Sequence, residues 1–134
     1  RVQAKGFTLF ELVIVLLIVA AVATYIGIRL PSTTLFRQSS ISEQLRRDIR
    51  YTQTLAMSLD STYSIVFTSN SYTITPAPPR GAYTVTMPTG VTLSAGSITF
   101  SATGAPAAAG SVTITGGGST TTLTVAAETG FVNG

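Results

Sequence analysis

The chain opens with one long apolar run. Residues 7–28 read FTLFELVIVLLIVAAVATYIGI, and Glu11 is the single charge among them. As an α-helix this run spans about 33 Å, close to the thickness of the hydrocarbon core of a bilayer. It is apolar on every side, unlike an amphipathic surface helix. A cleaved secretory signal is the alternative, but its apolar core is shorter and ends in a small-residue cleavage site. We therefore predict a retained transmembrane helix, bent or interrupted at its outer end by Gly27 and Pro31.

A second periodic segment covers residues 39–60. Its apolar positions are spaced by threes and fours, as one stripe of a helix requires. They are Ile41, Leu45, Ile49, Thr52 (by its methyl), Ala56 and Leu59. Ser40 followed by Glu43 has the spacing of a capping box, which predicts a helix start near residue 40. Three arginines, Arg46, Arg47 and Arg50, are expected to point away from the stripe.

From residue 61 onward the pattern changes to short β-rich pieces separated by proline and glycine turns. The predicted strands cover residues 63–68, 71–75, 82–87, 97–100, 111–115 and 121–125. Strands without intervening helices favour an antiparallel arrangement. The glycine triplet at 116–118 indicates a hairpin loop, because a phosphate-binding loop needs a following helix and a nearby lysine.

These elements predict an α+β fold, in which a long N-terminal helix packs on a mostly antiparallel β domain. The helix has a transmembrane half and an amphipathic half. We divide the chain into a leader (1–6), a transmembrane helix (7–30), a linker with the amphipathic helix half (31–60) and a β domain (61–134).

Composition leaves little room for catalysis. The 134 residues contain no Cys and no His, and only 10% are charged. The usual zinc ligands, the commonest general base and the best nucleophile are therefore missing. We expect no enzyme activity, no metal and no cofactor.

The net charge of +3 raises the possibility of nucleic-acid binding. Capture of phosphates needs lysines and arginines clustered on one face. Arg46, Arg47 and Arg50 are the only such set, and Glu43 and Asp48 stand among them. They are a weak candidate for DNA contact. The plainer interpretation is a solvated helix face with its own local acid pairs.

The junction of leader and apolar run carries the most specific motif, Lys5-Gly6-Phe7-Thr8-Leu9-Phe10-Glu11. It resembles the signature of type IV prepilins. The resemblance implies that an inner-membrane prepilin peptidase cuts between Gly6 and Phe7 and that the new amine of Phe7 is methylated. It also implies that Glu11 is the glutamate required for assembly.

Physical chemistry agrees with a role for Glu11. An ionised side chain in hydrocarbon costs on the order of 3 kcal/mol on insertion scales, so it needs a reason to be there. Cleavage would create a cation on Phe7, and Glu11 of one subunit would pair with the Phe7 amine of its neighbour. The alternative is that Glu11 merely occupies the first helical turn, where the helix dipole favours an acid.

The later sequence is similar to the H-type pseudopilin and FimT-like family. The string SEQLRRDIRYTQTLAMSLDSTYSIVFTSNSYTIT resembles its helix and hairpin, and Phe100, Gly104 and the Thr129-Gly130 turn resemble its closing strands. The resemblance implies a minor pilin or pseudopilin of a type II secretion or type IV pilus filament. Its partners would be other pilins, the prepilin peptidase and the inner-membrane assembly platform.

The same resemblance implies a single-pass protein of the bacterial inner membrane, with its C-terminal domain in the periplasm or in an extracellular pilus. Basic residues flank both ends of the apolar run, so the positive-inside rule hardly discriminates. A six-residue leader is also too short to form a domain on the cytoplasmic side, which favours an outward-facing β domain. A DNA-uptake minor pilin and a membrane-anchored adhesin are the alternatives. The resemblance disfavours DNA uptake, because relatives that take up DNA carry arginines in the C-terminal tail and residues 129–134 contain none.

Overall fold

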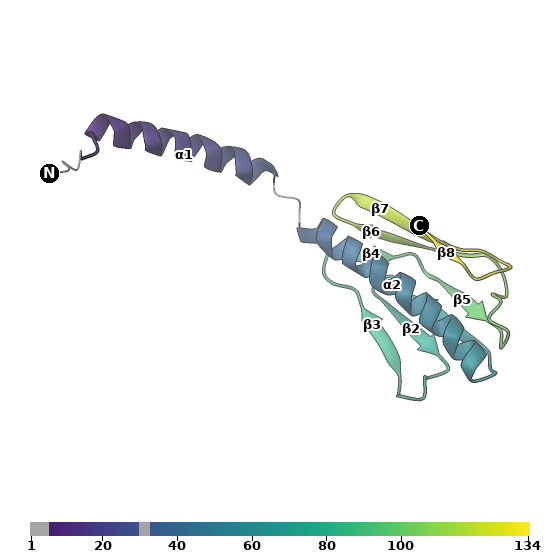
Figure 1. Cartoon of the computed structure of the whole chain (residues 1–134). Helices are drawn as coiled ribbons and strands as arrows, with labels where there is room; N and C mark the ends of the chain where they lie inside the picture. The colour runs from purple at the N-terminus through teal and green to yellow at the C-terminus, as the bar shows by residue number, and fades with distance from the viewer. Residues whose placement is uncertain (1–5, 30–32) are drawn as a thin grey trace. The chain divides into compact units, whose positions relative to one another are not determined.

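The computed structural model describes residues 6–29 and 33–134. The chain forms two compact units, Arg1–Pro31 and Ser32–Gly134 (Figure 1). The first unit contains helix α1 (Leu9–Arg29), and the second contains helix α2 (Thr33–Ser58) and eight strands.

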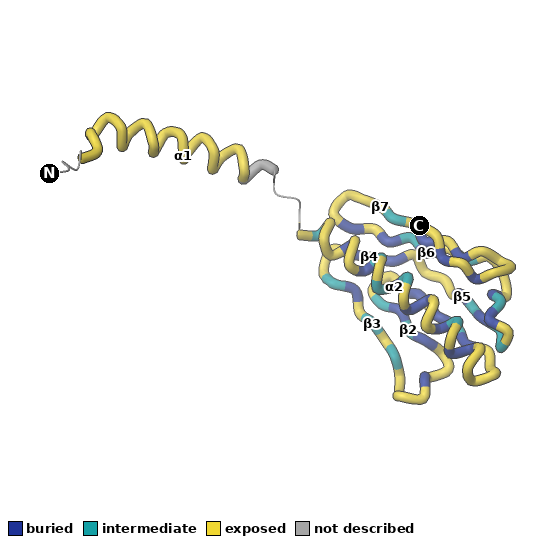
Figure 2. The backbone as a smooth tube through the Cα atoms, in the orientation of Figure 1, coloured by how far each residue is buried: buried dark blue, intermediate teal, exposed yellow. Residues whose placement is uncertain are grey.

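Helix α1 confirms the predicted apolar helix. The backbone N–H of Glu11 donates to the Thr8 hydroxyl at 3.2 Å, so Thr8 caps the helix. The side chains described in α1 are all exposed (Figure 2). The helix continues through Gly27 without interruption, whereas the break predicted at Pro31 lies outside the described residues.

Helix α2 begins at Thr33, several residues before the predicted start near 40. The predicted capping box at Ser40 and Glu43 is therefore wrong, because Ser40 lies inside the helix. Gln38 supplies a physical reason. Its buried side-chain amide donates to the carbonyl of Ile114 at 3.1 Å and to the Thr121 hydroxyl at 3.3 Å, so the first turns of α2 are held by strands far along the chain.

The buried stripe of α2 agrees with the prediction at every position but the last. Ile41, Leu45, Ile49, Thr52 and Ala56 are buried, and Leu55 joins them. Leu59 was wrongly included: the helix ends at Ser58, and the Leu59 side chain is exposed.

The strands form two antiparallel four-stranded sheets, in the orders β3-β2-β1-β5 and β4-β6-β7-β8. Their bounds are β1 (Tyr63–Phe67), β2 (Ser71–Thr75), β3 (Tyr83–Thr86), β4 (Val91–Leu93), β5 (Gly96–Phe100), β6 (Gly110–Gly116), β7 (Ser119–Val125) and β8 (Val132–Asn133). The six predicted strands are confirmed. The sequence analysis missed β4 and β8, which are too short to show an alternating pattern.

The glycine triplet forms the predicted hairpin loop between β6 and β7. Gly117 and Gly118 both have positive φ, at 57° and 78°. Two consecutive residues in this conformation give a turn whose twist matches the flanking strands, and glycine adopts it without steric cost.

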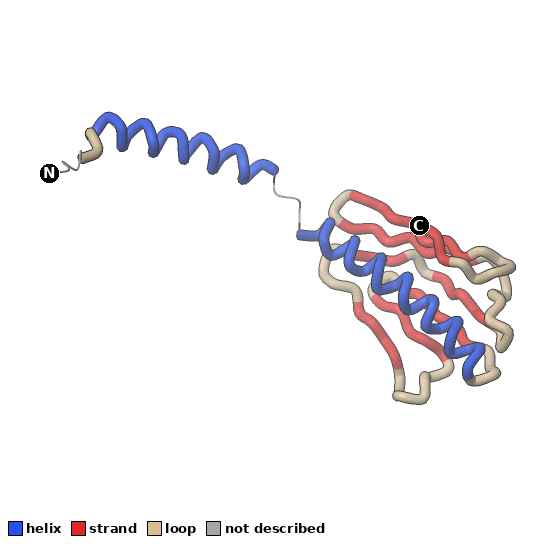
Figure 3. Tube along the Cα trace, viewed as in Figure 1, coloured by secondary structure: helices blue, strands red, loops and turns tan. Residues whose placement is uncertain are grey.

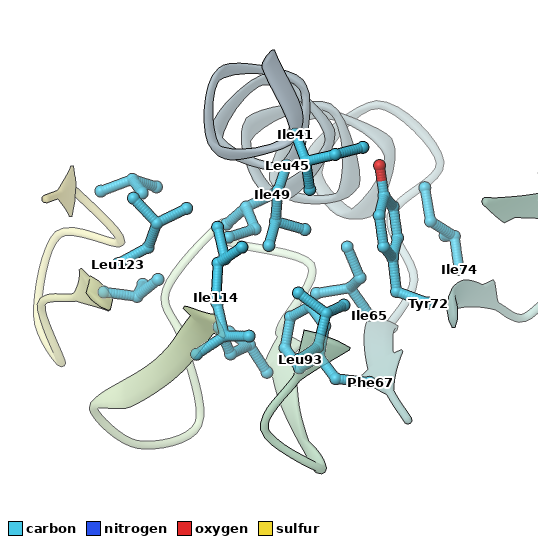
Figure 4. Packing of buried hydrophobic residues seen from close by; sticks show 14 of the residues in the cluster. Ile41, Leu45, Ile49, Ile65, Phe67, Tyr72, Ile74, Leu93, Ile114 and Leu123 are labelled. Carbon is cyan, nitrogen blue, oxygen red and sulfur yellow. The ribbon is translucent and has the colours of Figure 1, made fainter. Parts of the chain in front are cut away.

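The core lies between α2 and the two sheets, and Figure 3 shows α2 lying across the strands of both. Ile41, Leu45 and Ile49 point from α2 toward Ile114 of one sheet and Tyr72 of the other (Figure 4). All five are buried. Burial of this single apolar layer holds the two sheets and the helix together.

Serine and threonine cover the outer faces of the sheets. Threonine pairs hydrogen-bond across neighbouring strands, as Thr73 with Thr84 and Thr113 with Thr122 do. The strands contain no Asp, Glu, Lys or Arg. The sheet faces are therefore polar without being charged, and their hydroxyls partly satisfy one another.

Candidate processing and assembly site

Gly6, Phe7 and Glu11 lie together at the start of α1. Gly6 and Phe7 precede the helix, and Glu11 is the third residue within it. All three are exposed. Glu11 follows Phe7 by four residues, so the acid and the Gly6-Phe7 bond, where cleavage is predicted, belong to one short segment.

Thr8 and Glu11 have the spacing of a capping box, a signal that the sequence analysis did not use. The observed half of the box is the bond from the Glu11 N–H to the Thr8 hydroxyl. This cap fixes the start of α1 at Leu9, two residues after Phe7. It also places the Glu11 side chain at the positive end of the helix dipole, where an acid is favoured.

Apart from Glu11 and the Thr24 hydroxyl, the described side chains of α1 form a largely apolar surface. Leu9–Ile26 is long and apolar enough to cross a membrane, and none of it is buried within the chain. An exposed apolar helix of this size is stable in lipid or against other apolar helices. Because Glu11 is the only acidic or basic residue between positions 6 and 28, it is the one charge that such an environment must accommodate.

The three arginines of the candidate DNA-contact set differ in exposure. Arg47 and Arg50 are exposed on α2, as predicted. Arg46 is half-buried, and its guanidinium donates to the carbonyl oxygen of Gly134 at 2.6 Å. The expectation that all three point away from the buried stripe is therefore wrong for Arg46, and only two arginines remain fully at the surface.

Asp48 also differs from its predicted role as a local partner of these arginines. It is buried, and its Oδ2 accepts hydrogen bonds from the hydroxyls of Tyr72 at 2.5 Å and Tyr83 at 2.9 Å. Burial and the neighbouring carboxylate raise the pKa of both tyrosines above the ordinary value of 10.0. Asp48 thus ties α2 to β2 and β3, and no pattern in the sequence pointed to this cluster.

Replacing Tyr72 by phenylalanine should flatten the alkaline loss of stability. In the unfolded chain Tyr72 ionises near pH 10, whereas in the folded chain it keeps its proton to higher pH. The contribution of Tyr72 to the free energy of unfolding should therefore be fully present below pH 10. Above pH 10 it should fall by about 1.4 kcal/mol per pH unit. Urea unfolding of the full chain in detergent between pH 8 and 11 measures the slope. Thr73→Val on the outer face of β2 is the control, because it removes a hydroxyl but no titrating group, and it should leave the slope unchanged.

Among the described residues, no group of three or more His, Cys, Asp or Glu is placed to hold a metal ion. Asp48 is the buried acid of the domain, and its Oδ2 is already occupied by two tyrosine hydroxyls.

Gln53 of α2 joins two loops that the sequence analysis had singled out by resemblance. Its amide donates to the carbonyl of Gly104 at 2.8 Å and to that of Thr129 at 3.2 Å. Gly104 has a φ of 82°, and a Cβ added there would lie 2.5 Å from the sulfur of Met57. The loop favours glycine at this point because its backbone conformation is one that other residues rarely adopt, and a side chain there would also displace the flexible Met57 side chain.

Comparison with known proteins agrees with the N-terminal motif and with the fold. Residues 1–26 match the prokaryotic N-terminal methylation motif. No curated protein matches the chain.

Two crystal structures of the type IV minor pilin FimU of Pseudomonas aeruginosa resemble the chain. The first, in space group P21, has a TM-score of 0.58 at 16% identity, covering 71% of this chain and 85% of FimU. The second, in space group P65, has a TM-score of 0.57 at 17% identity, covering 71% of this chain and 90% of FimU. At such identities the likeness concerns the fold.

An apolar helix with a methylation motif at its start is thus followed by an α+β domain that folds like a minor pilin. These two findings show a prokaryotic N-terminal methylation motif on a chain whose domain has the fold of a type IV minor pilin.

Proposed function

We propose that this protein is a minor pilin or pseudopilin, cut after Gly6, methylated on the amine of Phe7 and assembled into a filament through α1. The observation that carries the proposal is the exposed apolar surface of α1, with Glu11 as its one charge, immediately after the Gly6-Phe7 junction. Such a helix buries its surface first in the bilayer and then against the α1 helices of other subunits.

Charge neutralisation explains why Glu11 stands there. Cleavage after Gly6 turns the Phe7 nitrogen into a cation. In the apolar core of a filament, the Glu11 carboxylate of one subunit and the Phe7 amine of the next neutralise each other. Burying either alone costs several kcal/mol, so the pair selects one axial register between neighbours.

The proposed setting is the bacterial inner membrane. Residues 7–30 span it once after removal of the leader 1–6, and residues 31–60 and 61–134 lie on the periplasmic side. Prepilin peptidase processes the chain, and an assembly platform draws it into the filament with other pilins.

The likeness to FimU in fold supports both forms of the proposal, a pilus minor pilin and an H-type secretion pseudopilin. A DNA-uptake role has less support. Arg46 is held by the Gly134 carbonyl, which leaves Arg47 and Arg50 as a small exposed pair. Adhesion through the surface of the domain is compatible with membership of a filament and would be a secondary role.

Intact mass of the protein extracted from membranes tests the proposal. In cells that contain prepilin peptidase, we expect a chain that begins at Phe7 and carries one additional methyl group. Gly6→Val should retain the leader, because the bulky side chain blocks the cleavage junction. Gly96→Ala is the matched control, since a Cβ at Gly96 meets no atom within 4 Å. A mature wild-type chain that still carries residues 1–6 would refute the proposal.

A further inference from the structure

The first turns of α2 lie at one end of the domain of residues 33–134, beside loops from the sheets. A Cβ built on Gly90 would lie 3.3 Å from the Thr34 side chain, and one built on Gly117 would lie 3.3 Å from the Leu35 side chain. Figure 1 shows the loop between β6 and β7 beside the start of α2. The proximal surface is defined as residues 33–37 together with loops 87–90 and 116–118.

The proximal surface presents an aromatic ring and a cation. Phe36 is 65% exposed, more than any other large apolar side chain described in the domain. The Arg37 guanidinium donates to the Thr89 carbonyl at 3.5 Å, and the Arg37 side chain is exposed. Side chains of an α-helix lean toward its N-terminus. Phe36 and Arg37 therefore lean toward the end of the domain, where the chain continues to α1.

Arg37 is the one charge that the described part of the domain places on the proximal surface. Loops 87–90 and 116–118 contain no charged residue. The β1–β2 turn, 68–70, is joined to loop 87–90 by a backbone hydrogen bond and is uncharged as well. The other charged residues of the domain lie further along α2 or in the loops that follow the far ends of α2, β2 and β7. They are Glu43, Arg46, Arg47, Asp48, Arg50, Asp60, Arg80 and Glu128.

No acid stands close to Arg37 along the chain. Arg29 and Arg37 are the only charged residues between Glu11 and Glu43. Glu43 is the nearest acid on α2, and it lies about 9 Å beyond Arg37 along the helix axis. An aromatic ring beside a cation, without a neighbouring acid, suits a surface that is apolar below and anionic above.

The covalent chain keeps the proximal surface close to a membrane. Helix α1 ends at Arg29 and α2 begins at Thr33, and the four Cα–Cα steps between them reach at most about 14 Å. The headgroup layer of one leaflet is about 5–8 Å thick. With α1 in a bilayer, the first turn of α2 is therefore held at or just above the lipid headgroups, at a high effective concentration.

We propose that the proximal surface docks on the anionic phospholipid surface of the membrane that α1 spans. The Phe36 ring enters the boundary between headgroups and acyl chains, where aromatic and aliphatic side chains of surface helices are buried. The Arg37 guanidinium binds lipid phosphate, and the uncharged loops approach the headgroups without repelling them. The inference rests on the proposed function, because it requires α1 in the bilayer.

Tryptophan fluorescence of the full chain tests the docking, because the chain contains no natural tryptophan. Chains with Phe36→Trp are placed singly in nanodiscs of phosphatidylcholine and phosphatidylglycerol, with or without bromine on the acyl chains. Bromine quenches tryptophan only at close range, so we expect the brominated lipids to quench this emission strongly. Phe131→Trp is the matched control, since Phe131 is 61% exposed beyond the far end of β7, and its emission should stay unquenched.

Removal of the cation tests the anionic character of the partner. On the Phe36→Trp background, Arg37→Gln should lower the ratio of docked to undocked chains about 5-fold, the loss expected for one cation at an anionic surface. In discs of phosphatidylcholine alone it should have little effect. Arg47→Gln is the control, because Arg47 is exposed on α2 about 15 Å further along the axis, and it should leave the quenching unchanged.

Leu16→Trp reports on the proposed function separately. Leu16 lies in the middle of the apolar span Leu9–Ile26, so bromine should quench this variant whether or not the domain docks. Quenching of Leu16→Trp without quenching of Phe36→Trp would reject the docking alone. Loss of quenching in both variants would reject the membrane helix itself.

Three further outcomes would overturn the docking. The first is equal quenching of Phe131→Trp, and the second is quenching of Phe36→Trp that Arg37→Gln leaves unchanged in anionic discs. The third is a blue-shifted Phe36→Trp emission that appears only with several chains in one disc and is not quenched by bromine. That result would indicate a protein partner in place of lipid.

Discussion

A Glu11→Ala chain is expected to insert into the membrane and lose its leader normally, yet to enter filaments at least ~100-fold less than the wild type. The amine of Phe7 would then be buried in an apolar core without a counter-charge. Breaking one partner of a buried pair costs about 3–5 kcal/mol, and each 1.4 kcal/mol is about a factor of ten. The amount of protein in sheared and sedimented filaments measures the effect, with membrane content and intact mass as the reference.

Thr8→Val separates this role from a role in starting the helix. It removes the side-chain oxygen that accepts the Glu11 N–H but keeps the carboxylate, so a missing cap alone should cost about 1 kcal/mol. Glu43→Ala, at an exposed position of α2, is the matched control for loss of one acid. If Thr8→Val abolished incorporation as fully as Glu11→Ala, the charge pair would not be the cause.

Leu45→Ala is expected to destabilise the domain by about 3–5 kcal/mol. Leu45 is fully buried, and Figure 4 shows it in the layer between α2 and the sheets. Truncating a buried leucine loses transfer free energy and leaves a cavity that its neighbours fill only in part. The total free energy of unfolding of a domain of this size is about 5–15 kcal/mol. The variant therefore approaches the limit of folding.

Leu59→Ala is the control for that substitution. This substitution makes the same chemical change at a position just after α2, but the Leu59 side chain is exposed. Substitutions at exposed positions usually change the free energy of unfolding by less than about 0.5 kcal/mol. Thermal unfolding of the full chain in detergent, followed by the near-UV signal of the tyrosines, should show a drop of roughly 10–20 °C for Leu45→Ala. Similar values for both variants would show that the core does not depend on the α2 stripe.

Some of this protein could be predicted from sequence because the responsible physics is local. The apolar run needs no partner to be recognised, since hydropathy and length alone indicate a membrane-spanning helix. Strand alternation in segments such as residues 111–115 and 121–125 reflects one buried and one solvated face. The glycine triplet between them marks a turn that few other residues accept. The motif from Gly6 to Glu11 is likewise contiguous.

Other features depend on contacts between segments far apart in the chain. Asp48 looked like a solvated acid beside arginines, but it is buried because Tyr72 and Tyr83 satisfy it from another element. Arg46 looked free and is bonded to Gly134. A local charge pattern contains no information about which strand comes to lie beside it.

The amino-acid sequence by itself thus determined the apolar N-terminal helix, its methylation motif, the α+β class and most of the strands, because periodicity and hydropathy act over a few neighbouring residues. Only the tertiary structure decided where α2 begins, through Gln38 and strands more than seventy residues away. It also decided which polar side chains are buried, as with Gln38 and Asp48. These depend on the packing of distant segments, which brings burial and hydrogen-bond partners together only when the chain folds.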